Sequence, residues 1–73
     1  MDYIYIRAWG KMTGSFGYYI ERQVNRAIDD KAPENAVYYS SYEKRWITLD
    51  ECNPNTQKRV NDWVEQIRAD REG

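Results

Sequence analysis

The sequence predicts an α+β domain, a two-layer sandwich in which two helices cover one face of a three-stranded sheet in the order βαββα. Three observations support this fold class. The chain has 73 residues, which is the length of one small domain. Three segments alternate their side chains with the period of a strand, and two repeat apolar residues with the period of a helix. We therefore expect a single domain over residues 1–73, with a frayed charged tail at 69–73.

The first predicted strand covers residues 2–9, where β-branched and aromatic residues alternate. One side of this strand would carry Ile4, Ile6 and Ala8, and the other side Tyr3, Tyr5, Arg7 and Trp9. Gly10, Gly14 and Gly17 then mark a loop that leads to a helix.

The first predicted helix runs from an N-cap at Ser15 to about Lys31. Its apolar residues are spaced i, i+4, i+7 and i+8, as one face of a helix requires. They are Ile20, Val24, Ala27 and Ile28, and Phe16 extends the stripe by one turn. Pro33 ends this helix because proline disfavours α geometry at the residue before it.

Residues 35–42 and 45–49 predict two further strands, joined by a turn at Glu43 and Lys44 into an antiparallel hairpin. The last helix begins at Asn53, a good N-cap, followed by Pro54 at the first helical position. Together the periods of these elements predict a hydrophobic core. It comprises Ile4, Ile6, Ile20, Val24, Ile28, Val37, Ile47, Leu49, Val60, Trp63, Val64 and Ile67.

Packing both helices on one face of the sheet would leave an aromatic face uncovered. An exposed apolar patch of this size is typical of an interaction site. The predicted partner-binding residues are Tyr3, Tyr5, Arg7, Trp9, Tyr38, Tyr42 and Trp46. Two alternatives stay open: the rings pair across strands only to stabilise the sheet, or the register is shifted by one residue, which would exchange the two faces.

The residue types exclude most catalytic and metal chemistry. The chain has no histidine and one cysteine, so it lacks histidine-dependent triads, disulfides and Cys–His metal sites. No cofactor and no metal are predicted. The carboxylate pairs at 29–30 and 50–51 are interpreted as solvated charges, with Thr48 and Glu51 at the spacing of a capping box. Cys52 is interpreted as a half-buried small residue.

The glycine-rich loop is a weak candidate for anion binding. Lys11, Thr13 and Ser15 lie in it, just before a helix N-terminus that attracts negative charge. The loop lacks the residue order of a P-loop. A plain connection between elements is therefore its main interpretation.

These features predict a non-enzymatic protein-binding module, a stoichiometric inhibitor or adaptor, with a homodimer as a further option. A net charge of -1 favours a protein partner over nucleic acid. The alternative is a module that stacks single-stranded nucleic acid on the same aromatic face. The element order resembles a truncated RNA-recognition-motif domain without its last strand, a resemblance of topology that carries over no residue. In size and kind the chain resembles small phage-encoded inhibitors of host defence, anti-CRISPR proteins among them.

The expected location is the cytoplasm. No segment is long and apolar enough to span a membrane, so no membrane partner is expected. Asp2 precedes the first apolar run and no basic leader is present, which argues against a secretory signal. A lone thiol fits a reducing compartment.

Overall fold

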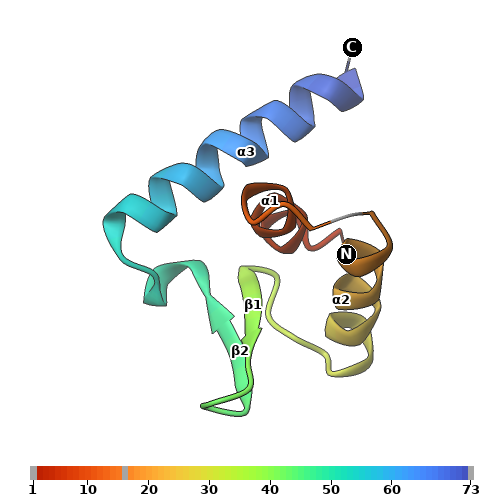
Figure 1. Cartoon of the computed structure of the whole chain (residues 1–73), viewed down its shortest axis with the longest axis vertical. Coiled ribbons are helices and arrows are strands. Elements are labelled where there is room, and N and C mark those ends of the chain that lie inside the picture. Colours follow the sequence, from red (N-terminus) through yellow and green to blue (C-terminus); the bar gives the residue numbers. More distant parts are fainter. Residues whose placement is uncertain (1, 16, 73) are drawn as a thin grey trace.

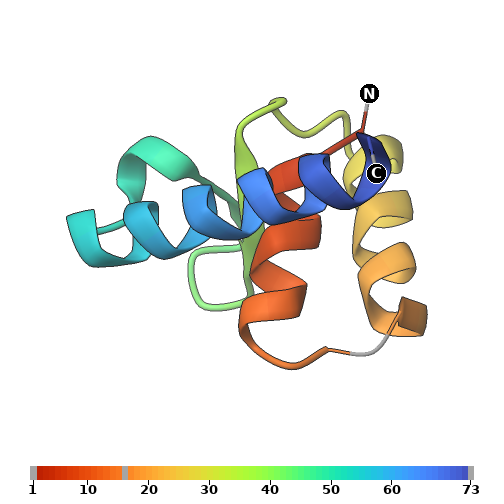
Figure 2. The ribbon, with the colours of Figure 1, turned by 90° about the horizontal axis from the view of Figure 1, so that it is seen from above.

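The computed structural model describes residues 2–15 and 17–72, which form three α-helices and a two-stranded antiparallel sheet. In chain order the elements are α1 (Ile4–Met12), α2 (Gly17–Asp29), β1 (Ala36–Ser40), β2 (Arg45–Thr48), the 3₁₀ turn η1 (Leu49–Glu51) and α3 (Pro54–Glu72). Figure 1 shows α1 near the centre, α3 above it, α2 to its right and the hairpin below. Figure 2 shows α3 lying across α1. Because α1 contacts α3, α2 and β1, it is the element around which the others pack.

The predicted three-stranded sheet and its βαββα order are wrong, because the expected first strand is the helix α1. Apolar residues at every second position also include residues four apart. Ile4, Ala8 and Met12 thus follow the i, i+4, i+8 spacing of a helix face. A short apolar run fits a fully buried strand and a buried helix equally well. The topological resemblance to an RNA-recognition-motif domain is lost with the first strand.

The helices α1 and α2 pack closely at Gly10, which is buried. A Cβ atom added to Gly10 would lie 2.5 Å from Cγ1 of Ile20 and 3.1 Å from its Cδ1. Glycine weakens a helix interior by about 1 kcal/mol relative to alanine. Here the close packing of two helices offsets that cost, so a glycine expected to punctuate a loop is a helix–helix contact.

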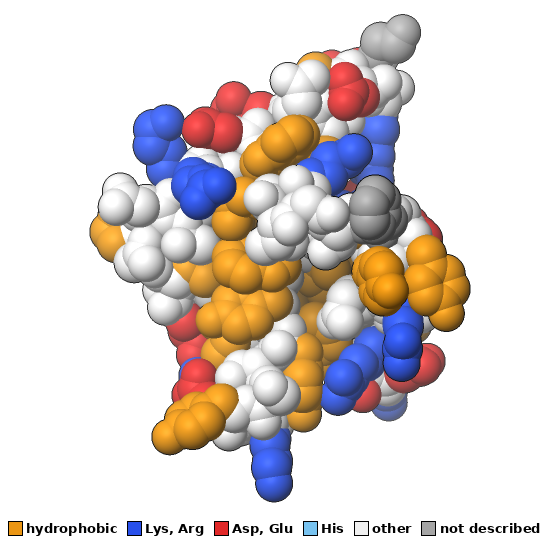
Figure 3. Space-filling model, viewed as in Figure 1, with side chains coloured by type: hydrophobic (Ala, Val, Ile, Leu, Met, Phe, Trp, Pro, Cys, Tyr) orange, Lys and Arg blue, Asp and Glu red, His pale blue; other side chains and the backbone are white. Residues whose placement is uncertain are grey.

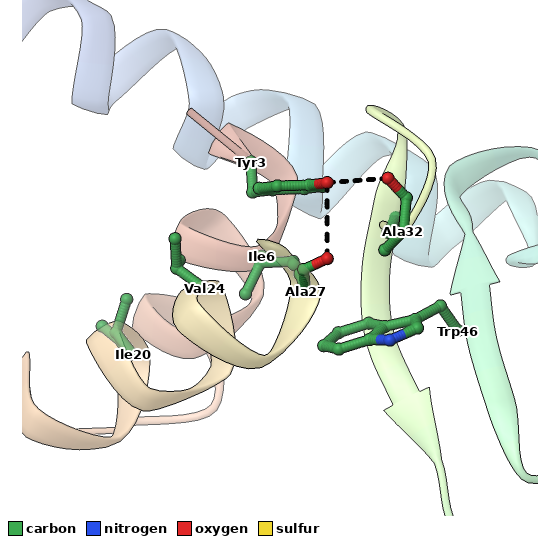
Figure 4. Close-up of a cluster of buried hydrophobic side chains, with 8 residues drawn as sticks. Tyr3, Ile6, Ile20, Val24, Ala27, Ala32 and Trp46 are labelled. Atoms are coloured by element: carbon green, nitrogen blue, oxygen red, sulfur yellow. Dashed lines mark hydrogen bonds between the residues drawn. The ribbon is translucent and has the colours of Figure 1, made fainter. Parts of the chain in front are cut away.

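The C-terminal end of α2 is closed by a Schellman motif with Lys31 in the left-handed region (φ 55°). The Lys31 N–H donates to the Ile28 carbonyl (3.1 Å), and the Ala32 N–H donates to the Ala27 carbonyl (2.9 Å). The phenol of Tyr3 donates to the Ala32 carbonyl (2.7 Å), as Figure 4 shows. The residue before α1 is therefore bonded directly to the segment that follows α2.

The first hydrophobic cluster fills the space between α1, α2 and the hairpin (Figure 4). Its buried members are Tyr3, Ile6, Ile20, Val24, Ala27, Ala32, Ala36 and Trp46. Trp46 reaches from β2 toward α2, where its Nε1–H donates to Oδ2 of Asp30 (2.9 Å). Tyr39 packs against this cluster.

The predicted antiparallel hairpin is confirmed, with Tyr38 opposite Ile47 and Tyr39 opposite Trp46. The register shifts between Ala36 and Tyr38, as at a β-bulge. A second hydrophobic cluster lies between α1, β1 and α3. Its buried members are Ala8, Val37, Val60, Val64 and Ile67, and Tyr38 packs against it. β1 therefore contributes to both clusters.

The predicted start of α3 is confirmed, because the Thr56 N–H donates to Oδ1 of Asn53 (2.8 Å) and Pro54 is the first helical residue. The helix continues through Glu72, into the charged tail that the sequence predicts to fray. Gly73 and Phe16 lie outside the described residues. None of the described helices is both long and apolar enough to cross a membrane.

Two residues of the predicted core lie at the surface: Ile28 is 51% exposed and Trp63 is 37% exposed. For Trp63 the reason is that α3 packs mainly on α1, which covers only the stripe of Val60, Val64 and Ile67; Ile28 lies on α2, outside the buried residues Ile20, Val24 and Ala27. Apolar spacing alone predicts a wider buried face than the neighbouring elements cover. Ile4 and Leu49 are half-buried, and the remaining predicted core residues are buried.

Candidate functional site

The residues predicted to share one aromatic sheet face lie in different environments, because that sheet does not form. Tyr3 and Trp46 are 4% and 8% exposed and belong to the first hydrophobic cluster. Tyr5 is half-buried against the second cluster. These three side chains contribute mainly to the packing of the fold.

The remaining predicted residues are also separated. Tyr42 is 94% exposed in the turn between β1 and β2. Arg7 forms ion pairs with Glu21 and with Asp2, whose Oδ1 lies 3.4 Å from the Arg7 Nε. Trp9 and Tyr38 are in direct contact, with stacked rings whose centroids are 4.8 Å apart.

The stacked pair lines a cleft of about 300 Å³ where α1, α2 and β1 meet, which we call the aromatic cleft. Its aromatic residues are Trp9 from α1, Tyr19 from α2, and Tyr38 and Tyr39 from β1. The other lining residues are Ile6, Gly10, Ser15, Ile20, Gln23 and Val37, so no lining side chain is charged. Figure 3 shows hydrophobic side chains gathered along the middle of this face, over the hairpin and below α1.

Local structure explains how each wall of the aromatic cleft forms. Tyr19 and Gln23 are four residues apart on α2 and therefore share one helix face. Trp9 lies one residue before Gly10, at the point where α1 and α2 approach each other. On β1, Tyr38 packs toward the second cluster and Tyr39 toward the first. The cleft thus receives rings from both sides of the strand.

Sequence reasoning missed two aromatic residues of this cleft. Tyr39 and Tyr19 are both absent from the predicted partner-binding residues. The signal for Tyr19 is a second face of α2, beside the apolar stripe, where Tyr19, Gln23 and Arg26 follow the i, i+4, i+7 spacing. That mixed face borders the hairpin.

A cation lies at the border of the aromatic cleft. The Cζ atom of Arg26 is 3.9 Å from the centroid of the Tyr39 ring, a cation–π contact. The Arg26 Nε lies 3.7 Å from Oδ2 of Asp30, and that same oxygen accepts the Trp46 hydrogen bond. The Arg26 side chain is half exposed, and its ion pair with Asp30 is longer than a hydrogen bond.

The weak candidate site for anions lies between two helices, and no strand precedes it. Lys11 is in the last turn of α1, where its charge complements the helix C-terminus. The Thr13 hydroxyl donates to the Trp9 carbonyl (2.9 Å) and lies 3.3 Å from the Ser15 Oγ. Ser15 lines the aromatic cleft, whereas Lys11 lines a separate depression. The structure brings Thr13 and Ser15 together and leaves Lys11 apart.

The polar and thiol side chains that follow β2 stabilise the fold and form no reactive site. The predicted capping box is confirmed, because the Thr48 N–H and hydroxyl both donate to Oε2 of Glu51, at 2.9 and 3.0 Å. Burial, assisted by the Glu51 charge, raises the pKa of the half-buried Cys52 thiol. A raised pKa disfavours the reactive thiolate. Within residues 2–15 and 17–72, no three potential metal-ligating side chains of His, Cys, Asp or Glu gather at one place.

Comparison with known proteins finds no family model that matches this chain, and no curated protein or solved structure with significant similarity to it. The candidate site is therefore assigned from its own geometry. Its distinguishing features are four aromatic side chains, an uncharged lining and one arginine at the border.

Proposed function

We propose that this protein is a non-enzymatic protein-binding module, a stoichiometric inhibitor or adaptor, that takes an apolar side chain of its partner in the aromatic cleft. The observation that supports this most is the concentration of four aromatic residues around a cleft without charged lining. Tyrosine and tryptophan are enriched as anchors of protein interfaces. The cleft volume of about 300 Å³ lies at the lower end of the range for binding pockets.

Single-stranded nucleic acid is the alternative ligand. It is favoured by the contact between Arg26 and Tyr39, which places a cation on an aromatic ring as in base-stacking sites. Against it, Trp9 and Tyr38 already cover one face of each other's ring. The net charge of -1 gives little attraction for phosphates. A protein partner is therefore the better proposal.

We place the protein in the cytoplasm, because a single free cysteine is compatible with a reducing compartment. A second copy of the chain is a further candidate partner. If the captured partner is a component of a host defence system, the inhibitor proposal extends to the phage-encoded class named above.

The proposal is tested by capturing partners with the tagged full chain and comparing two neighbouring tyrosines. Tyr19 lines the aromatic cleft, whereas Tyr18 lies outside it, and the two are 55% and 73% exposed. Tyr19→Ala should lower the affinity of a captured protein by about 30-fold, the loss expected for an interface anchor. Tyr18→Ala should bind nearly as the native chain does.

Nuclease treatment and salt separate the two ligand classes. A protein partner should survive nuclease and depend only weakly on salt, because apolar burial is not screened. A nucleic-acid ligand should be lost with nuclease and weaken about a thousandfold between about 50 and about 200 mM salt. Binding that persists unchanged in Tyr19→Ala would contradict the aromatic cleft as the site.

A further inference from the structure

The aromatic cleft runs along an edge of β1 that has no neighbouring strand. The sheet has two strands, so β1 pairs with β2 on one edge only. Figure 1 shows β2 on one side of β1 and α2 on the other. Three consecutive residues of β1, Val37, Tyr38 and Tyr39, line the cleft. Because Tyr38 and Tyr39 pack into clusters on different sides of the strand, the cleft meets the strand at its edge.

The backbone of β1 has no partner strand on this edge, which is half-buried at Tyr38 and Tyr39 and fully buried at Val37. In the part of the chain that the structure describes, residues 37–39 make no backbone hydrogen bond outside the hairpin. A strand edge with unpaired N–H and C=O groups is a template for another strand. The Trp9–Tyr38 stack and Tyr19 line the cleft beside this edge.

We propose that the aromatic cleft binds an extended segment of the partner protein, which adds as a third strand beside β1. Main-chain hydrogen bonds to β1 would supply affinity, and alternate side chains of the segment would supply specificity. One of those side chains is apolar and enters the cleft. This proposal rests on the protein-binding function proposed above and specifies how the partner is held.

Charge complementarity identifies the second feature of the segment. Arg26 is the charged side chain that contacts a ring of the cleft, and its ion pair with Asp30 is long, at 3.7 Å. Asp30 also accepts the hydrogen bond of the Trp46 indole. A guanidinium with free N–H groups binds carboxylates in particular. The segment therefore carries an acidic residue near its apolar anchor.

The probe is a pool of random peptides displayed on phage and selected for binding to the full chain. We expect the selected peptides to share an apolar residue close to an acidic one. Their binding should be lost in Tyr19→Ala and retained in Tyr18→Ala. Peptides that bind both variants equally would contradict the cleft itself, and with it the proposed function.

Strand addition is tested on one selected peptide by methylating its backbone nitrogens one at a time. In a strand paired along one edge, every second residue directs its N–H and C=O toward the partner strand. Methylation at those positions should weaken binding about fivefold or more, and at the intervening positions much less. Uniform tolerance of methylation, with binding still dependent on Tyr19, would overturn strand addition and leave the protein-binding function standing.

The acidic feature is tested with two arginines of α2. Both arginines line a second surface depression on α2, and Arg26 in addition contacts Tyr39 beside the cleft. Arg26→Gln should weaken an acidic peptide about tenfold and its amide analogue little. Arg22→Gln should affect neither peptide. Equal losses in both variants would mean that the arginines act only by general charge attraction. That result would contradict the role of Arg26 as a carboxylate partner.

The competing occupant is a second copy of the chain, paired strand to strand along β1. Sedimentation of the free protein, with amide hydrogen exchange at β1, tests it directly. A monomer in which the β1 amides directed away from β2 gain protection only when the peptide is added supports the proposal. A dimer that already protects those amides without peptide would overturn it.

Discussion

At the scale of single residues, the three tryptophans show how environment decides the role of one side chain. Trp9 is half-buried and stacks on Tyr38 in the aromatic cleft. Trp46 is buried, and its indole N–H has the hydrogen-bond partner that a buried indole needs, Asp30. Trp63 lies on α3 and is 37% exposed. The sequence-based prediction placed Trp46 at the interface and Trp63 in the core, and both assignments are reversed.

The reversal predicts unequal losses of stability on truncation. Trp46→Ala removes a buried ring and leaves a cavity, which costs about 3 to 5 kcal/mol. Trp63→Ala should cost less, about 2 kcal/mol, because more than a third of that residue is already exposed to water. Urea unfolding followed by circular dichroism measures both free energies. Equal losses would mean that α3 packs through a different face.

A residue in the left-handed backbone region predicts a substitution that increases stability. Lys31 has a φ of 55° at the C-terminal motif of α2, where glycine is the usual residue. Lys31→Gly should raise the free energy of unfolding by about 0.5 to 1 kcal/mol, because glycine adopts this conformation without steric cost. The matched change Lys58→Gly, inside α3, should lower it by about 1 kcal/mol. Destabilisation by Lys31→Gly in thermal melts would contradict the Schellman geometry.

At the scale of elements, the sequence predicts the features that depend on residues close together in the chain. Asn53 and Pro54 specify the start of α3, and the apolar stripe of α2 specifies its buried face. The hairpin follows from two short runs and a turn. The first segment has no such signal, because Ile4 to Met12 is apolar on several sides and its helical state depends on partners distant in sequence.

The candidate site was predictable to a similar extent. Trp9 and Tyr38 were both expected at a binding surface, but on different strands of one sheet. In the structure they meet because a helix brings Trp9 over the edge of β1. The spacing of Tyr19, Gln23 and Arg26 marks a second face of α2, but Tyr19 joins the site through the close packing of α1 and α2, a tertiary contact.

The close contact between α1 and α2 predicts that Gly10→Ala destabilises the protein although alanine favours helices. The added methyl would meet Ile20 at 2.5 Å, and overpacking of this kind typically costs about 1 to 3 kcal/mol. Gly17→Ala is the matched control, because nothing lies within 4 Å of its added Cβ. Chemical denaturation of the two variants makes the comparison. Stabilisation by both substitutions would show that the helices do not approach at Gly10.

At the scale of the whole molecule, ion pairs connect segments that are far apart in the chain. Arg71, at the end of α3, pairs with Asp2, just before α1. Arg7 of α1 pairs with Asp2 and with Glu21 of α2. Each pair is solvent-exposed and contributes little alone. Together they link all three helices, and they account for the order of a tail whose composition predicts fraying.

Two of the ion pairs in the molecule, Arg71–Asp2 and Arg45–Glu51, lower carboxyl pKa values in the folded state. The Arg71 guanidinium holds the pKa of Asp2 below its ordinary value. A hydrogen bond from Arg45, with those from Thr48, lowers the pKa of Glu51 to about 2. A carboxyl group whose folded pKa is depressed stabilises the native state above its unfolded pKa. That stabilisation is lost as the pH falls toward the folded value.

Acid should therefore destabilise this protein between about pH 4.5, the ordinary value for a glutamate, and about pH 2. The double variant Asp2→Asn, Glu51→Gln keeps amide oxygens as hydrogen-bond acceptors but loses both charges. It should be less stable than the native chain at neutral pH and show a flatter loss of stability through the acid range. Melting temperatures measured from neutral pH to about pH 2 test this, and high salt should flatten the native profile in the same way because it screens exposed pairs. A double variant with the same acid profile as the native chain would mean that these pairs do not form in solution, and the ordered end of α3 would then need another cause.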